Sequence, residues 1–375
     1  MEDFKLLTKF RRDLHRIPEL SFDLPETIRY VRGVLDGLSC EVTTPCESCV
    51  CAFFDVGAAC GRESGGPATA VRADMDALPI TENSGVEFCS AKPGHMHACG
   101  HDGHMAMALA AACWVDEVLR GVREGAACPL PRNVLFVFQP AEETTGGARI
   151  VCESGVFERY HADRIFGFHV WPDLPAGVVA TRPGALLARA SETHVTIHGT
   201  SSHIAKSADG NDALLAGAHF LTGVEALMAE LSAEEPCLLK FGLMQSGTVC
   251  NAGSLRVFSD EMFDRARAGV EERLAGACAT YGCTYDLDFA EGYPPVTNDT
   301  ALYDLAKSAL GDTLELVPEP LLIAEDFAFY QRHLPGLFML LGTGTGIPLH
   351  SDEFRMDEDV LVRGLETYRA LLQCE

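Results

Sequence analysis

The chain has little positive charge and no segment that marks it for secretion or for a membrane. Its 29 Lys and Arg residues stand against 54 Asp and Glu residues, which gives a formal net charge of −25. That charge argues against nucleic acid or an anionic membrane as a partner held by bulk electrostatics. The N-terminus lacks the basic-then-apolar pattern of a secretory signal, and no apolar run looks long enough to cross a bilayer. We therefore expect a cytoplasmic protein.

A disulfide framework is missing as well, although the chain has 15 cysteines. Their number is odd, their spacing is irregular and most lie in apolar segments, which is typical of free thiols in a reducing compartment. A glycine–threonine run at 342–346 lacks the Gly-Lys-Ser/Thr ending with which a P-loop holds phosphate. The 375 residues are 47% hydrophobic, enough for a large core and about the length of two domains.

One thiol and three imidazoles fall within nine residues, at 96–104. Apolar residues recur on every turn from 105 to 120, which predicts a helix directly after this cluster. The unpaired amides and the dipole at a helix N-terminus favour a thiolate at Cys99. A thiolate and the imidazole of His101, two residues apart, are ligands that zinc prefers. The alternative is a buried cysteine beside surface histidines.

Carboxylates follow two expected strands: Asp74 and Asp76 after 69–72, and Glu142 and Glu143 after 133–138. Open α/β sheets place their sites at such strand ends, and buried carboxylates are costly without a positive partner. A solvated turn would explain the two aspartates equally well, and an acidic pair at a helix start is an alternative for the two glutamates. His169 lies in a short apolar strand, where a histidine is more often part of the core than a ligand.

Together these side chains offer a donor set for two neighbouring divalent metals: Cys99, His101, Glu143, His169 and His350. Such a pair of ions would lower the pKa of a water and polarise a carbonyl oxygen. Glu142 would then take the proton of the water and pass it to the leaving nitrogen. His203 would stabilise the oxyanion.

The chain changes character near 189. From there to 292 it reads strand–helix–strand–strand–helix–strand, typical of a split βαβ domain, with an irregular stretch at 246–254 before a strand near 255–259. Helices and strands of the first kind resume at 293. We predict one domain from 1–188 and 293–375, and a smaller domain inserted at 189–292.

The chain resembles the M20 metallopeptidase family, in the amidohydrolase branch that includes hippurate hydrolases, indole-3-acetyl-amino-acid hydrolases and N-acetyldiaminopimelate deacetylases. The matching stretches follow the family's order and cover nearly the whole chain. They are RDLHRIPE at 12–19, RADMDALP at 72–79, MHACGHD at 96–102, FQPAEE at 138–143, GFHV at 167–170, EDF at 325–327 and LHS at 349–351. The resemblance implies an α/β catalytic domain with a central mixed sheet and a dinuclear metal site, plus an inserted α+β, ferredoxin-like lid that mediates dimerisation.

The resemblance also implies roles for single residues. The metal ligands would be Cys99, His101, Glu143, His169 and His350, with Cys99 bridging two ions of zinc or manganese, or of cobalt or nickel. Glu142 would be the general base, with Asp76 and Glu325 orienting ligands. In the lid, His203 can reach a neighbouring subunit's site, and Asn251 and Arg256 can hold the substrate's carboxylate. Only four residues separate Asn251 from Arg256, fewer than in the family, so this edge of the lid departs from its pattern.

These features favour a metal-dependent hydrolase that cleaves the amide bond of an N-acyl amino acid. A dipeptidase or aminopeptidase would use the same site, and the short lid segment leaves a catalytically impaired member as an alternative. A cysteine hydrolase with Cys99 as nucleophile is disfavoured, because His101 is too near in the chain to reach the thiol well. We expect a homodimer or higher oligomer formed through the lid, acting on small molecules.

Overall fold

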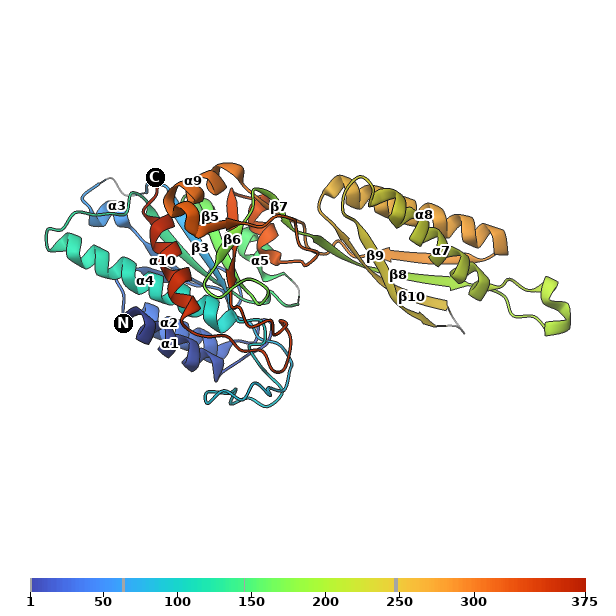
Figure 1. The fold of residues 1–375 in the computed structure, drawn as a ribbon, viewed down its shortest axis with the longest axis horizontal. Coiled ribbons are helices and arrows are strands. Elements are labelled where there is room, and N and C mark those ends of the chain that lie inside the picture. The colour runs from blue at the N-terminus through green and yellow to red at the C-terminus, as the bar shows by residue number, and fades with distance from the viewer. Residues whose placement is uncertain (1, 63–64, 145, 246–248) are drawn as a thin grey trace. The chain divides into compact units, whose positions relative to one another are not determined.

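The structure is a computed structural model that describes residues 2–62, 65–144, 146–245 and 249–375 (Figure 1). The chain divides into two compact units. The first unit comprises Met1–Gly184, Thr297–Pro318 and Phe329–Glu375, and the second comprises Ala185–Val296 and Glu319–Ala328. The sequence-based boundaries left 319–328 in the first domain. Its backbone instead bonds to the start of the second unit, where Leu321 N donates to Leu186 O at 2.8 Å.

An eight-stranded mixed sheet forms the centre of the first unit, as predicted. Its order is β1-β2-β4-β3-β5-β14-β6-β13, with β4, β3, β5 and β14 mutually parallel. The strands are β1 (Glu41–Thr43), β2 (Val50–Phe54), β3 (Ala68–Asp74), β4 (Asn133–Gln139), β5 (Ala162–Trp171), β6 (Val179–Thr181), β13 (Leu314–Leu316) and β14 (Gly336–Gly342). Every residue of β3, β4 and β14 is buried, because helices cover both faces of a parallel sheet and its strands become continuous apolar runs.

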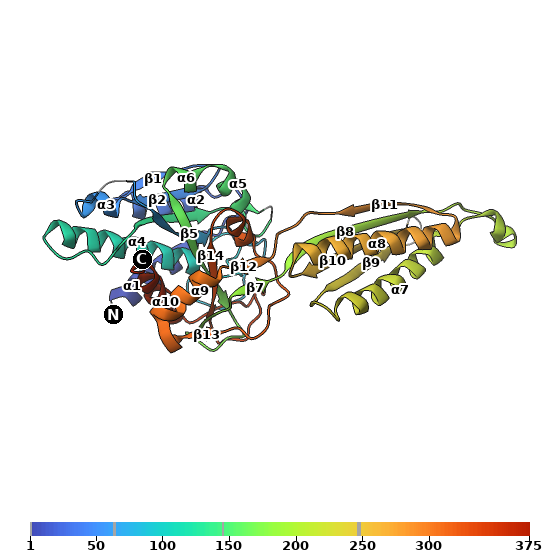
Figure 2. The ribbon, with the colours of Figure 1, turned by 90° about the horizontal axis from the view of Figure 1, so that it is seen from above.

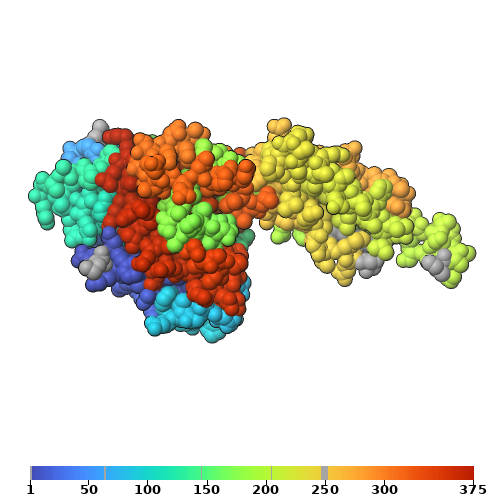
Figure 3. All heavy atoms as spheres, viewed as in Figure 1, coloured from blue at the N-terminus to red at the C-terminus, as the bar shows by residue number. Residues whose placement is uncertain are grey.

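Helices cover this sheet (Figure 1). They are α1 (Glu2–His15), α2 (Pro25–Leu35), α3 (Val56–Ala59), α4 (His101–Arg123), α5 (Gly147–Glu153), α6 (Val156–Arg159), α9 (Thr300–Leu310) and α10 (Val360–Leu372). The two ends of the chain meet in this layer, because α1 packs beside α10 and Arg369 forms an ion pair with Asp3 at 2.7 Å. In Figure 3 the N-terminal and C-terminal residues adjoin on one face of the unit.

Helix α4 begins four residues earlier than the apolar pattern predicted. Gly100 caps its N-terminus with a φ of +84°, a left-handed conformation that glycine adopts without a steric cost. A Cβ added to Gly100 would also lie 2.5 Å from the Val170 side chain. His101 and His104 therefore lie in the first turn of the helix and not in the preceding loop, so the helix backbone sets the directions of their side chains.

The second unit is a four-stranded antiparallel sheet with two helices on one face (Figure 2). Its elements are β8 (Arg189–His198), α7 (Ala213–Leu231), β9 (Leu238–Gln245), β10 (Val249–Val257), α8 (Asp260–Tyr281) and β11 (Thr284–Phe289), and the sheet order is β11-β8-β10-β9. That order is the ferredoxin-like arrangement expected of the inserted domain. Short segments complete the chain: β7 (Gly184–Leu187), β12 (Val296–Asn298), η1 (Ile204–Asp209), η2 (Gly311–Thr313) and η3 (Asp326–Arg332).

Two expectations for the second unit need correction. The stretch at 246–254 was predicted to be irregular, but strand β10 already starts at Val249; residues 246–248 lie outside the described residues. The expectation that no segment is long enough to cross a membrane is also wrong, because α7 meets that test by length and composition. Its residues Phe220, Val224 and Leu227 recur at helical spacing and pack into the core of the unit.

Candidate metal centre and active site

The parallel strands of the first unit bring the candidate residues to one edge of the sheet. Asp74 ends β3, Glu142 and Glu143 follow β4, His169 lies near the end of β5, and His350 follows β14. The carboxyl ends of parallel strands meet at one edge, where open α/β sheets place their sites. The first turn of α4 reaches the same edge, because His101 and Cys99 contact residues from these strands.

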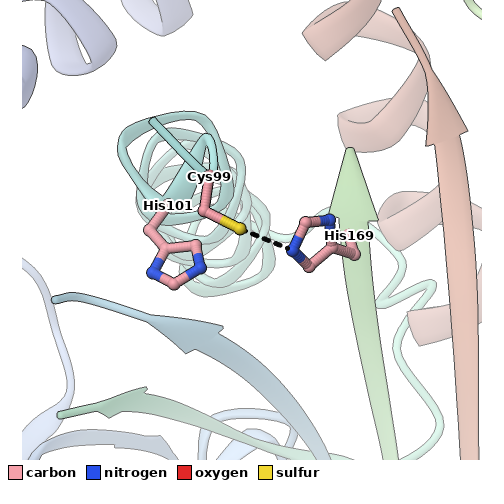
Figure 4. Close-up of side chains that lie close together, drawn as sticks. All are labelled: Cys99, His101 and His169. Carbon is pink, nitrogen blue, oxygen red and sulfur yellow. Dashed lines mark hydrogen bonds between the residues drawn. The ribbon is translucent and has the colours of Figure 1, made fainter. Parts of the chain in front are cut away.

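Three of the candidate ligands lie close together, and the sulfur of Cys99 points at His169 (Figure 4). Cys99 Sγ lies 3.3 Å from His169 Nε2, and the ligating atoms of Cys99, His101 and His169 all lie within 4.8 Å of one another. All three side chains are buried. A thiol and two imidazoles at this spacing, shielded from water, could hold one metal ion.

Backbone carbonyls fix which nitrogen of each histidine faces this centre. His101 Nδ1 donates to Asp76 O at 2.8 Å, and His169 Nδ1 donates to Val170 O at 2.7 Å. A carbonyl only accepts, so the proton of each neutral ring is on Nδ1 and the lone pair is on Nε2. Both lone pairs point at the centre, which is the tautomer that a metal ligand needs.

A second group of donors shares the thiol with the first. Cys99 Sγ lies 3.3 Å from His350 Nε2, and His350 Nε2 lies 3.4 Å from Glu143 Oε1. The ligating atoms of Cys99, Glu143 and His350 again lie within 4.8 Å of one another. Cys99 belongs to both groups, so the described donors offer two candidate ion sites that share this sulfur.

Burial and charge set the protonation of this cluster. Burial lowers the pKa of His169 to about 3 and also lowers that of His101. Although burial opposes it, the histidines around Glu143, His350 first, bring the pKa of Glu143 down to about 2. Burial, with the charges of Glu143 and Glu142, raises the pKa of the Cys99 thiol. The expectation that the start of α4 favours a thiolate at Cys99 is therefore wrong for the protein without metal.

The donor set fits two divalent metals. His101 Nε2 and Glu143 Oε1 are fully buried at its centre, and neither has a hydrogen bond of ordinary geometry among the described residues. Buried polar atoms are costly when unpaired, and a cation between them would satisfy both. Sulfur, imidazole and carboxylate donors together suit zinc and other first-row metals.

Asp76 holds the backbone of the paired glutamates. Its carboxylate accepts hydrogen bonds from Glu142 N at 2.9 Å and from Glu143 N at 3.2 Å. The preceding Ala141 has a φ of +54°, so the chain turns sharply out of β4 at this point. Burial raises the pKa of Asp76 despite these two amide bonds. Asp76 thus fixes Glu142 and Glu143 through its side chain and His101 through its backbone carbonyl.

Sequence reasoning assigned no role to a buried network behind these ligands. Arg72 Nη1 donates to Asp74 Oδ2 at 2.7 Å, and His104 Nδ1 donates to Asp74 Oδ1 at 2.7 Å. Val170 N donates to His104 Nε2 at 2.9 Å, which leaves the ring proton on Nδ1. The network ties β3, α4 and β5 together beside His169. An arginine inside an apolar strand was the available signal, because a buried guanidinium requires a partner.

The remaining predicted residues lie in the second unit. His203 is exposed, and its Nδ1 accepts from Ala205 N at 3.1 Å. Arg256 follows Leu255, which is buried in the core of the unit, and its Nη1 donates to Ser254 Oγ at 2.8 Å. Asn251 pairs through its backbone with Val195 on β8, and its side chain lies outside the described residues.

Glu325, predicted to orient a ligand, is also part of the second unit. It is buried, and its Oε1 accepts a hydrogen bond from Phe327 N at 3.0 Å. This bond lies at the start of η3 and stabilises the local turn. The predicted role of Glu325 toward the metal ligands stays a prediction.

Comparison with known proteins places the chain among hydrolases. A model of peptidase family M20/M25/M40 matches residues 70–373. A protein of Synechocystis sp. named as a probable hydrolase is 35% identical over 96% of this chain and 93% of its own length. An uncharacterized hydrolase of Staphylococcus aureus is 32% identical over 99% and 98%. The crystal structure of the Bacillus subtilis YXEP protein, described as a dinuclear metal-binding peptidase of family M20, superposes with a TM-score of 0.84 at 30% identity, covering 99% of this chain and 97% of its own.

Proposed function

This chain belongs to peptidase family M20/M25/M40 and is a hydrolase of that family, and on that premise we propose that it cleaves the amide bond of N-acyl amino acids. The observation that carries the proposal is the pair of donor groups that share Cys99, with a further carboxylate beside them. The ligands would be Cys99, His101, Glu143, His169 and His350. We place the protein in the amidohydrolase branch of the family and in the cytoplasm.

Two bound divalent ions, zinc or manganese or else cobalt or nickel, would activate a water and polarise the amide carbonyl. Glu142 takes the proton of the attacking water on its carboxylate and passes it to the amide nitrogen as the C–N bond breaks. The products are the free acid of the acyl group and the amino acid. Glu142 suits this task because its backbone is fixed by Asp76 and its carboxylate lies within 4.8 Å of His101 and Glu143 ligand atoms.

Residues of the second unit complete the proposal. His203 stabilises the oxyanion that forms on the carbonyl oxygen, and Asn251 and Arg256 hold the carboxylate of the amino acid. A guanidinium recognises a carboxylate by two parallel hydrogen bonds. Arg256 is half-buried and burial lowers its pKa, so an anion beside it would be favoured. We also propose that the protein forms a homodimer or a higher homo-oligomer through this unit.

The test is turnover by full-length protein loaded with zinc or manganese. N-acetyl and N-benzoyl amino acids and free dipeptides are offered in one panel, and release of the amino acid is measured. We expect turnover of the acylated substrates. Hydrolysis of the free dipeptides alone would instead identify a dipeptidase or aminopeptidase, and no turnover of any substrate would indicate an impaired member of the family.

The role of Glu142 has its own test. Glu142→Gln removes the proton acceptor and keeps the size of the side chain, so we expect bound metal unchanged by elemental analysis and turnover reduced by about 10²-fold or more. Glu153→Gln, an exposed glutamate of α5 in the same unit, is the matched control and should keep full activity. Undiminished activity in Glu142→Gln would show that another group is the base.

A further inference from the structure

Three cysteines lie within six residues where β1 turns into β2, in a part of the first unit that the proposed reaction does not use. Cys49 N donates to Cys46 O at 3.3 Å, which closes a four-residue turn. The first and last Cα atoms of such a turn lie within about 7 Å of each other. A disulfide requires about that separation or less, so the backbone already presents Cys46 and Cys49 at a spacing that a disulfide can close.

The turn is held in place by its own side chains. Ser48, its third residue, has a φ of +56°, a conformation that non-glycine residues adopt at a steric cost. The hydroxyl of Ser48 donates to the carbonyl oxygen of Phe22, which fixes the strained residue. The backbone hydrogen bond of the turn and the hydrogen bond of Ser48 therefore hold Cys46 and Cys49 close together.

The two thiols differ in their access to solvent. Cys46 is half-buried and can be reached, whereas Cys49 is fully buried, with its sulfur 3.8 Å from that of Cys51. The neighbouring Cys49 thiol lowers the pKa of Cys46, whereas the Cys46 and Cys51 thiols, together with burial, raise the pKa of Cys49. An accessible thiol with a lowered pKa, backed by a protected second thiol, is the arrangement of a reactive dithiol.

We propose that Cys46 and Cys49 form a reversible dithiol–disulfide site that exchanges with low-molecular-weight disulfides. The Cys46 thiolate attacks one sulfur of the small disulfide, whose S–S bond breaks and releases one thiolate. Cys49 then loses its proton and attacks the Cys46 sulfur, which releases the second thiolate. The protein loses two protons and two electrons, and the small disulfide takes up both electrons and two protons to become two thiols.

The experiment uses reduced full-length protein incubated with oxidised glutathione, then alkylated with iodoacetamide and analysed by peptide mass. We expect Cys46 and Cys49 to carry no alkyl group and their peptide to be two hydrogens lighter than with both thiols free, and dithiothreitol to reverse this. Cys49→Ser should retain glutathione on Cys46 as a mixed disulfide, and Cys46→Ser should form neither product. Cys89→Ser, which removes an exposed thiol elsewhere in the first unit, is the control and should behave as the unmodified chain.

Two results would overturn the proposal. One is full alkylation of both cysteines after exposure to oxidised glutathione. The other is a disulfide that disappears in Cys51→Ser but persists in Cys46→Ser. A measurement on the unmodified chain avoids any folding defect of the variants: in a brief iodoacetamide pulse, Cys46 should react about 10-fold or more faster than Cys49, because thiolate fraction and exposure set the rate. Equal rates would contradict the assignment of Cys46 as the attacking thiol.

Discussion

Two ion pairs of equal length, one in each unit of this protein, lie in opposite surroundings. In the first unit, Arg72 and Asp74 form an ion pair at 2.7 Å in which both side chains are 0% exposed. In the second unit, the pair between Arg265 and Glu234 has the same length, but its side chains are 40% and 59% exposed. Two ion pairs of equal length therefore differ in what their loss costs in stability, because water screens the exposed pair and is excluded from the buried one.

This difference shows what each unit depends on. The first unit contains a set of buried charges around its candidate metal centre. Each of these charges is stabilised by a neighbouring charge or hydrogen bond, so the loss of one leaves another unpaired. The second unit has an apolar core, with Phe220 and Leu274 among its buried residues, and its Arg265–Glu234 ion pair lies at the surface. Polar substitutions should consequently be costly in the first unit and mild in the second.

The largest expected effect comes from removing one charge of the buried pair. Arg72→Met leaves the Asp74 carboxylate buried with one fewer cation, and breaking such a pair typically costs about 3–5 kcal/mol. Because Asp74 also accepts from His104, we expect metal affinity to fall together with the free energy of unfolding. Urea denaturation and a metal titration measure the two effects.

Arg29→Met, on the exposed side of α2, is the matched control and should leave both quantities unchanged. A stability of Arg72→Met equal to that of the unmodified protein would break the comparison between the units. It would mean that Asp74 finds sufficient compensation from His104 alone.

The next effect is a pH dependence that belongs to the first unit. His15 Nδ1 lies 2.8 Å from Asp102 Oδ2, and Nε2 lies 3.1 Å from Glu82 Oε1. Although burial opposes protonation, these carboxylates, Asp102 first, raise the pKa of His15 from 6.5 to about 9. At about 1.4 kcal/mol per pH unit, this rise contributes on the order of 3 kcal/mol to folding.

The sign follows from the direction of the shift. A group whose pKa is raised by folding stabilises fully below its unfolded pKa of 6.5, and the contribution disappears as the pH rises through about 9. The temperature at the midpoint of unfolding should therefore decrease as the pH rises from 6.5 to 9. This decrease should be smaller in His15→Gln. Parallel curves for the two proteins, measured by circular dichroism, would show that His15 does not titrate with folding.

The sequence predicted much of the first unit for a physical reason. Ligand residues must follow apolar strands whose parallel pairing brings their ends together, so the positions of Glu143 and His169 could be inferred from runs of hydrophobic residues. The mixed sheet and the ferredoxin-like insertion were likewise predicted. The start of α4 was missed, because polar residues such as His101 break the apolar pattern while the left-handed Gly100 begins the helix.

Features that depend on long-range contacts could not be read in this way. The network of Arg72, Asp74 and His104 joins three elements, and no local pattern pairs them. The attachment of 319–328 to the second unit depends on backbone bonds that carry no sequence signal. The first part of strand β10 was not predicted. Glycine and small polar residues near Gly253 suggested a loop, but pairing with β8 makes this stretch part of the strand.

A smaller effect is expected at a helix cap in the second unit. Ser259 Oγ accepts a hydrogen bond from Met262 N at 3.1 Å at the start of α8. Ser259→Ala removes this bond and the hydrogen bond that Oγ donates to the Glu235 carboxylate at 2.9 Å, and should lower the free energy of unfolding by about 1 to 2 kcal/mol. Asp212→Ala at the equivalent cap of α7 is the matched variant and should give a loss of similar size. A loss as large as that of Arg72→Met would erase the contrast between the two units.

The smallest effect is expected at the exposed pair of Arg265 and Glu234. Arg265→Ala breaks an ion pair that water and salt already screen, so the midpoint of thermal unfolding should not change measurably, at low or at high salt. A double-mutant cycle with Glu234→Ala isolates the pair from other effects of each substitution. A clear coupling in that cycle would show that the surface charges of the second unit act together. The contrast between a first unit that depends on buried charges and a second unit that depends on apolar packing would then hold only for the core residues.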